Sequence, residues 1–123
     1  MFSDYAPHIL SVPGNVRLPT DGGANNNYAF RTPRLRNLSM TAPYRHSGVF
    51  SSLGQVLDFY DGVGGCRSQN AYVANNQLDA TLQLLNNNDK NTLTGFLNAL
   101  NDGSFDKRIP ATVPSGLHPG GNI

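Results

Sequence analysis

The sequence lacks most of the features that staple or anchor a small protein. Its 123 residues include one cysteine, Cys66, which excludes an internal disulfide and leaves a free thiol. No spacing of cysteine and histidine resembles a structural zinc site. There is no basic run and the formal net charge is +1, so we expect no nucleic-acid partner. No apolar run approaches the roughly 20 residues of a membrane span, and the first residues lack the pattern of a signal peptide.

Glycine, proline and asparagine are abundant, whereas charged residues make up only 14% of the chain. This composition predicts a large share of loop and turn. A domain of this size buries only about two thirds of its unfolded surface, so its core is thin. We therefore expect a cofactor, an oxygen-bound cation or further polypeptide to stabilise it.

Residues 1–27 are expected to form an extended loop, because three prolines and clusters of glycine and asparagine occur among them. His8 lies here beside Ile9 and Leu10. A lone histidine in this setting is typically a partly buried residue that hydrogen-bonds the backbone.

The next segment is predicted to be loop with one short helix or strand over residues 34–40. Pro33 and Pro43 bracket it, and proline disfavours helix at the residue before it. Three cations lie close together, and they are either solvated or paired with carboxylates: Arg31, Arg34 and Arg36.

A short helix begins after Ser52, which forms a capping-box pattern with Gln55. Apolar residues share one face of it: Leu53, Val56, Leu57 and Tyr60. Tyr60 therefore points inward, and such a tyrosine is most often a core aromatic whose hydroxyl finds one partner. Gly62, Gly64 and Gly65 end the helix.

The later sequence predicts a short helical turn over residues 78–85 and a last helix with Asp89 as its N-cap. Gly103 closes that helix. Its apolar stripe comprises Leu93, Phe96, Leu97 and Leu100. Prolines and glycines in residues 103–123 predict an irregular arm.

Three stretches resemble, in order and spacing, consecutive motifs of the bacterial di-haem cytochrome c peroxidases: Phe30–Asn37, Thr41–Gly48 and Leu53–Gly65. They are similar to the C-terminal haem domain, and Phe2–His8 resembles the stretch that follows its haem-attachment motif. The resemblance implies a mainly α, cytochrome c-like haem domain fragment, loop-rich, with two to four short helices. Residues 28–102 would be the domain portion, flanked by the N-terminal loop and the C-terminal arm.

The family attaches haem through Cys-x-x-Cys-His, and this sequence has no such motif. We therefore expect the chain to be a C-terminal fragment, with haem c attached to a missing upstream domain that is its main partner. The isolated chain is expected to have no peroxidase activity.

Carried over by position, the resemblance implies five site residues. Tyr60 matches the distal axial ligand of the haem iron, where many members have methionine and the methylamine-utilisation (MauG) branch has tyrosine. Arg36 would bind a haem propionate and His46 would lie at the inter-haem interface. Thr41 and Pro43 match backbone carbonyls that bind calcium.

The implied function is reduction of hydrogen peroxide in the periplasm, with electrons from a small cytochrome c or a cupredoxin. A phenolate ligand is a hard anion that favours ferric iron and lowers the reduction potential. Two alternatives remain: a portion of a mono-haem electron-transfer module, and a haem-free interaction domain without catalysis.

Overall fold

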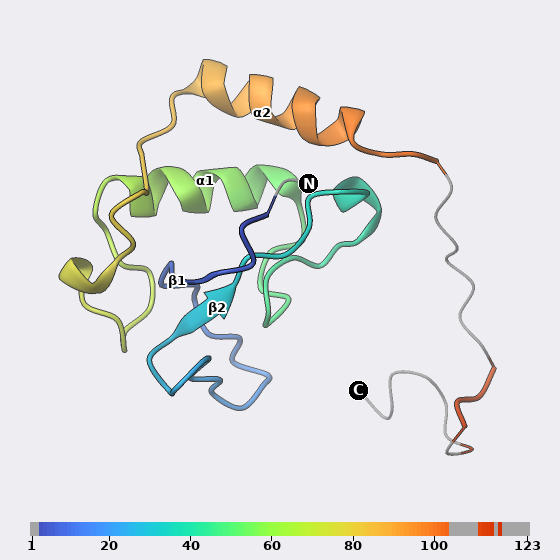
Figure 1. Ribbon diagram of the computed structural model, residues 1–123, viewed down its shortest axis with the longest axis horizontal. Helices are drawn as coiled ribbons and strands as arrows, with labels where there is room; N and C mark the ends of the chain where they lie inside the picture. Colours follow the sequence, from blue (N-terminus) through green and yellow to red (C-terminus); the bar gives the residue numbers. More distant parts are fainter. Residues whose placement is uncertain (1–2, 104–110, 115, 117–123) are drawn as a thin grey trace.

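The computed structural model of the chain describes residues 3–103, 111–114 and 116. In Figure 1, two helices lie one above the other, and a small sheet with long loops lies below them. The elements follow in the order β1 (Pro7–Ile9), β2 (Ala29–Arg31), the 3₁₀ turn η1 (Leu38–Met40), α1 (Leu53–Gly64), the 3₁₀ turn η2 (Asn75–Gln77) and α2 (Asn87–Ala99).

The expectation of a mainly α fold is wrong. Within the described ranges there are only two α-helices, of 12 and 13 residues, and the first 50 residues contain a sheet and loops instead. Proline and glycine disfavour helix here, and several other residues take left-handed backbone conformations that a helix does not allow. Those with positive φ before α1 are Tyr5, Ser11, Asn25, Asn26, Tyr28, Asn37 and Arg45.

The sheet is an antiparallel pair of three-residue strands. His8 of β1 faces Phe30 of β2, and Pro7 faces Arg31 at the start of the strand. Proline is tolerated at that position because a strand end does not need its missing amide donor. Strand β1 therefore lies inside the segment that was expected to be loop.

Helix α1 has the predicted limits, and its capping is confirmed in part. The Ser52 hydroxyl accepts a hydrogen bond from the Gln55 amide at 3.3 Å. The Gln55 side chain accepts from the amide of Ser51 at 2.8 Å, rather than from Ser52 as a capping box requires. The helix ends at Gly64, whose backbone packs so closely against Gln83 that a Cβ would clash.

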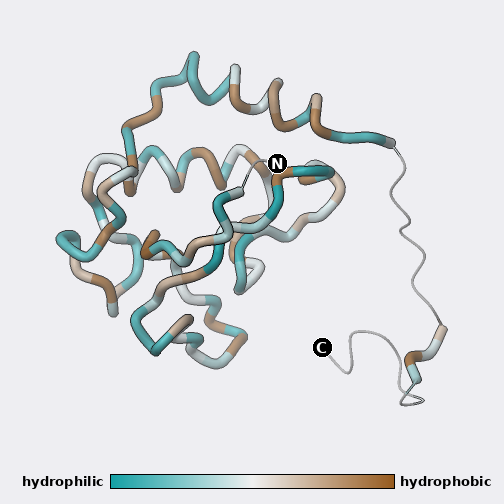
Figure 2. The backbone as a smooth tube through the Cα atoms, in the orientation of Figure 1, coloured by the Kyte–Doolittle hydropathy of each residue, from teal (hydrophilic) through white to brown (hydrophobic). Residues whose placement is uncertain are grey.

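The core lies under α1 and is small. Val12, Phe59 and Val63 are buried together, and Tyr60 packs at the edge of this cluster. The buried face of α1 therefore differs from the predicted one. Leu57 is buried as expected, but Phe59 and Val63 are the helix residues at the centre of the core. Figure 2 shows apolar and polar residues alternating along both helices, which fits two half-covered elements.

Helix α2 begins one turn earlier than predicted. Asn86 is its N-cap and exchanges hydrogen bonds with Asp89, so Asp89 is the third residue of a capping box rather than the cap. The helix ends at Ala99, before Gly103. Leu97 is its buried residue, whereas Phe96 is 41% exposed. Lys90 ties α2 to α1 through Asp58 at 2.9 Å and Asp61 at 3.0 Å.

The helical turn predicted over residues 78–85 is absent, and the 3₁₀ turn η2 lies just before it. Most of the predicted C-terminal arm, residues 104–110, 115 and 117–123, lies outside the described residues. In the part that the structure describes, no helix is long and apolar enough to cross a membrane.

Candidate functional site

Tyr60 lies in the third turn of α1 and is half-buried. Its ring meets the ring of the preceding Phe59 edge-on, with centroids 5.8 Å apart. The same ring belongs to the rim of the core cluster, so the tyrosine is anchored on one side and reaches the surface on the other. A phenolic oxygen held in this way can serve as a ligand for a group that docks on that side.

The guanidinium of Arg45 covers both aromatic rings. Its Cζ atom lies 4.4 Å from the ring centre of Tyr60 and 4.8 Å from that of Phe59. Both distances are within the range of a cation–π contact. Arg45 comes from the loop between η1 and α1, so this loop is fastened to the helix by a cation on two aromatic faces. The sequence motif contained this arginine, but its pattern gave no reason to single it out.

His46 lies beside Arg45 but turns to another partner. Its ring stacks on Phe30 of β2, with centroids 3.6 Å apart and planes 7° from parallel. Desolvation of this ring lowers the pKa of His46 and Arg45 acts in the same direction, whereas Asp21 opposes them. The imidazole is therefore mainly neutral at pH 7, with one ring nitrogen as a donor and the other as an acceptor.

Arg36, unlike Arg45, does not lie over the ring of Tyr60. It forms an ion pair with Asp102 just after α2, and 71% of its side chain is exposed. The side-chain oxygen of the neighbouring Asn37 accepts a hydrogen bond from the backbone amide of Asp102 at 2.9 Å. The backbone amide of Asn37 donates to the carbonyl of Leu100. Arg36 therefore connects the η1 region to the segment after α2 through its Nη2 atom.

Thr41 and Pro43 lie on the exposed loop that leads from η1 to Tyr44. The Thr41 hydroxyl donates to the carbonyl of Leu38 at 3.1 Å, and the buried Tyr44 hydroxyl donates to the same carbonyl at 2.8 Å. Among the described residues, no group of three or more histidine, cysteine, aspartate or glutamate side chains could hold a metal ion. Carbonyl-bound calcium at Thr41 and Pro43 stays a prediction.

Two shallow cavities flank the core. One, of about 360 Å³, lies between the N-terminal loop and the segment after α1, and His46, Ser47 and the stacked pair Tyr28 and Tyr72 line it. The other, of about 420 Å³, is lined by Phe50, Phe59 and four further residues around α1. Tyr60 lines neither of them. A group bound at Tyr60 would therefore need other walls than these two cavities provide.

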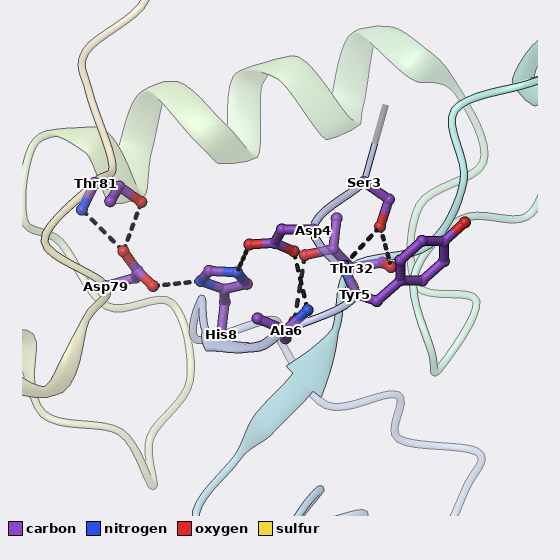
Figure 3. Close-up of polar contacts among 8 residues, drawn as sticks. All are labelled: Ser3, Asp4, Tyr5, Ala6, His8, Thr32, Asp79 and Thr81. Carbon is purple, nitrogen blue, oxygen red and sulfur yellow. Dashed lines mark hydrogen bonds and ion pairs between the residues drawn. The ribbon is translucent and has the colours of Figure 1, made fainter. Parts of the chain in front are cut away.

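A histidine between two carboxylates joins the N-terminal segment to the loop between η2 and α2 (Figure 3). His8 Nδ1 lies 2.5 Å from Asp79 Oδ2, and Nε2 lies 2.7 Å from Asp4 Oδ2. Asp79 also accepts from the amide and the hydroxyl of Thr81. The expectation that His8 bonds the backbone is wrong, because two carboxylates, one of them 71 residues away, take both ring nitrogens.

These contacts move the pKa values of all three groups. The hydrogen bond to Asp79 is the largest cause that raises the pKa of His8, followed by the bond to Asp4. The hydrogen bond to His8, followed by those from the hydroxyl and the amide of Thr81, lowers the pKa of Asp79 to about 2, and His8 also lowers that of Asp4. Both carboxylates favour the protonated imidazole, so the cluster acts as a structural tie that is strongest when His8 is an imidazolium.

The residues fit one side of a haem pocket. A phenolic oxygen is a known type of axial ligand for haem iron, and an adjacent arginine with unsatisfied nitrogens suits the carboxylates of the porphyrin. Cys66 is free and exposed, as expected. The sequence contains no covalent attachment motif and so cannot supply the other side.

The fold and sequence together define a class of protein. The chain belongs to the di-haem cytochrome c peroxidase and MauG family, of which it spans a part. It is 35% identical over 101 residues to a cytochrome-c peroxidase, IdrP2, of Denitromonas iodatirespirans; the match covers 82% of this chain and 24% of that protein. The family carries haem c.

Two other relatives and one solved structure agree. A methylamine utilization protein MauG of Paracoccus denitrificans (strain Pd 1222) is 34% identical over 59 residues, 48% of this chain and 14% of MauG. A cytochrome-c peroxidase, IdrP1, of Pseudomonas sp. (strain SCT) is 64% identical over 36 residues, 29% of this chain and 10% of the relative. The chain thus spans about a quarter or less of these relatives. No family model matches it.

The crystal structure of a MauG-like protein associated with microbial copper homeostasis has a similar fold. It superposes with a TM-score of 0.58 and 22% identity, over 83% of this chain and 36% of that one. At this identity the likeness concerns the fold alone.

Proposed function

We propose that the chain forms the distal side of the C-terminal haem pocket of a MauG-like di-haem peroxidase, with Tyr60 as the axial ligand of the iron. The observation that carries this is the position of Tyr60 on α1, half-buried, anchored by Phe59 and covered by a cation, in a chain of this family.

When bound, the haem supplies a redox-active iron. The chain's own part is to offer a hard, anionic oxygen, which favours ferric iron over ferrous iron. Phe59 and Val63 behind the ring exclude water and keep the ring in one orientation. A haem with this ligand is a poor acceptor of electrons from a high-potential donor and suits the storage of oxidising equivalents.

In the intact protein we place peroxide reduction at the other, N-terminal haem, whose protein groups are not in this chain. Hydrogen peroxide is the substrate, and the electrons come from a small cytochrome c or a cupredoxin in the periplasm. His46, neutral and stacked on Phe30, lies on the loop that would face the upstream domain, and Thr41 and Pro43 would offer carbonyls to calcium at the same interface.

The ferric absorption spectrum of the intact haem-bearing protein tests this proposal. We expect a band of phenolate-to-iron character that disappears in Tyr60→Phe and persists in the matched control Tyr72→Phe, whose ring is 68% exposed. Identical spectra for wild type and Tyr60→Phe would refute Tyr60 as the ligand. In the isolated chain we expect no stoichiometric haem and no turnover.

A further inference from the structure

Arg45 has an unusual set of unsatisfied atoms. Among the described residues, its Nε and Nη2 have no hydrogen-bond partner, and both atoms are shielded from solvent. Buried polar groups in native proteins are nearly always paired, so each exception calls for an explanation. The aromatic rings of Phe59 and Tyr60 attract the charge but do not replace in-plane acceptors for the N–H groups.

The backbone conformation of Arg45 is a second indication of a ligand site. Its φ is +73°, in the left-handed region that a residue with a Cβ adopts at a cost. Strained backbone of this kind persists where the surrounding structure holds it, and it clusters at ligand sites. The side chain of this residue lies over Phe59 and Tyr60 of α1. The tight turn is closed by a hydrogen bond from the Gly48 amide to the Arg45 carbonyl at 3.1 Å.

Three other cations of the described chain have oxygen acceptors within it. Arg36 pairs with Asp102, and Lys90 bridges Asp58 and Asp61. Arg34 donates its Nε to the Tyr5 hydroxyl at 3.2 Å. These are exposed or helix-linking contacts with an oxygen acceptor in place, whereas the guanidinium of Arg45 is held in position with its acceptor missing.

We infer that Arg45 is a carboxylate-binding residue that receives its ligand beside Tyr60. Nε and Nη2 form the side edge of the guanidinium, and two parallel N–H groups on one edge match the two oxygens of a carboxylate. Lysine could not offer this fork. Arg45 as a whole is half-buried whereas Nε and Nη2 are shielded, so a docking carboxylate reaches these two atoms only if the groups that cover them move aside.

A carboxylate at this place has two sources: a haem propionate, or an aspartate or glutamate of the haem-bearing part of the protein. The inference rests on the proposed function in that both bring a group to the Tyr60 side of α1. It differs in the residue that it tests, and it does not require Tyr60 to bind iron.

The experiment uses the intact haem-bearing protein with Arg45→Met, Arg45→Lys and, as a control, Arg34→Met. The readouts are the reduction potential of the C-terminal haem and the propionate bending bands in resonance Raman spectra. Loss of the cation leaves a carboxylate uncompensated, so we expect Arg45→Met to make haem reduction about tenfold less favourable, about 59 mV for one electron. Arg45→Lys restores part of the change, and Arg34→Met changes nothing.

A shifted propionate band with the lower potential identifies the haem as the source. Unshifted bands exclude a propionate as the ligand, because loss of a nearby cation lowers the potential whether or not a carboxylate binds it. An unchanged potential and unchanged bands in Arg45→Met, with the far-ultraviolet circular dichroism of the wild type, would overturn the inference. The failure of the Tyr60 proposal is read separately, from the missing phenolate band in the wild type.

Discussion

The tie between His8 and Asp79 makes a defined contribution to the stability of the fold, which Asp79→Asn removes. The pKa of Asp79 falls from its ordinary value of 3.8 to about 2, and only 20% of its side chain is exposed. Because one pKa unit is worth about 1.4 kcal/mol, the ionised carboxylate, through its bonds to His8 first and then to Thr81, stabilises the folded chain by about 2 kcal/mol at pH 7. Asparagine keeps the shape and the acceptor for Thr81 but loses the charge.

The pH dependence of the folding stability follows from the directions in which folding shifts the pKa values of Asp79 and His8. The pKa of Asp79 is lowered on folding, so its contribution is complete above about pH 4 and is lost as the pH falls toward 2. The pKa of His8 is raised, so its contribution is complete below about pH 6.5 and is lost as the pH rises through the raised pKa. In Asp79→Asn, the folding stability should therefore change less with pH, both at acidic pH and above about pH 6.5.

Urea unfolding of the chain, followed by far-ultraviolet circular dichroism at several pH values, measures this effect. A double-mutant cycle with His8→Gln isolates the pair, and we expect a coupling of at least about 1 kcal/mol. The reasoning is wrong if Asp79→Asn unfolds at the same urea concentration as the wild type at pH 7, or if the two substitutions are additive.

Two further substitutions test the packing, each beside a control of the same chemistry. Gly64→Ala places a Cβ against the backbone of Gln83 and should destabilise by about 1–3 kcal/mol, whereas Gly95→Ala, in open space on α2, should stabilise by up to about 1 kcal/mol. Tyr44→Phe removes a buried hydroxyl bond to Leu38 and should cost about 1 kcal/mol. Equal urea midpoints for the two glycine variants, or a Tyr44→Phe variant as stable as the wild type, would contradict the packing described here.

Local signals in the sequence were sufficient for the position of α1. Ser52 and the glycines after Tyr60 mark its ends, and the structure has the helix between them. It was harder to predict which side of α1 is buried. Phe59 and Val63 are covered by Val12, and this contact depends on the path of the N-terminal loop. The period of apolar residues identifies a helix, but neighbours distant in sequence decide which residues are covered.

The mainly α expectation failed for a related reason. Short strands that pair residues 7–9 with residues 29–31 carry almost no local signal, and the prolines there pointed to loop. The cap of α2 was misplaced by one turn because Asp89 and Asn86 are both good caps, and only the geometry shows that they act together.

The candidate site was predictable in its motif and not in its contacts. Tyr60 could be chosen from spacing and resemblance. The partner of Arg36 lies 66 residues away and that of His8 lies 71 residues away, so no local pattern could reveal them. Nothing in the sequence singled out Arg45. Its distinguishing feature is that Nε and Nη2 have no hydrogen-bond acceptor in the folded chain, which only the structure shows.

The most direct test of the central claim is the resonance Raman spectrum of the ferric intact protein, excited in the phenolate-to-iron band. The account predicts tyrosinate ring vibrations in the wild type that vanish in Tyr60→Phe and survive in Tyr72→Phe. Tyrosinate vibrations of equal intensity in wild type and Tyr60→Phe, or none in the wild type, would contradict it.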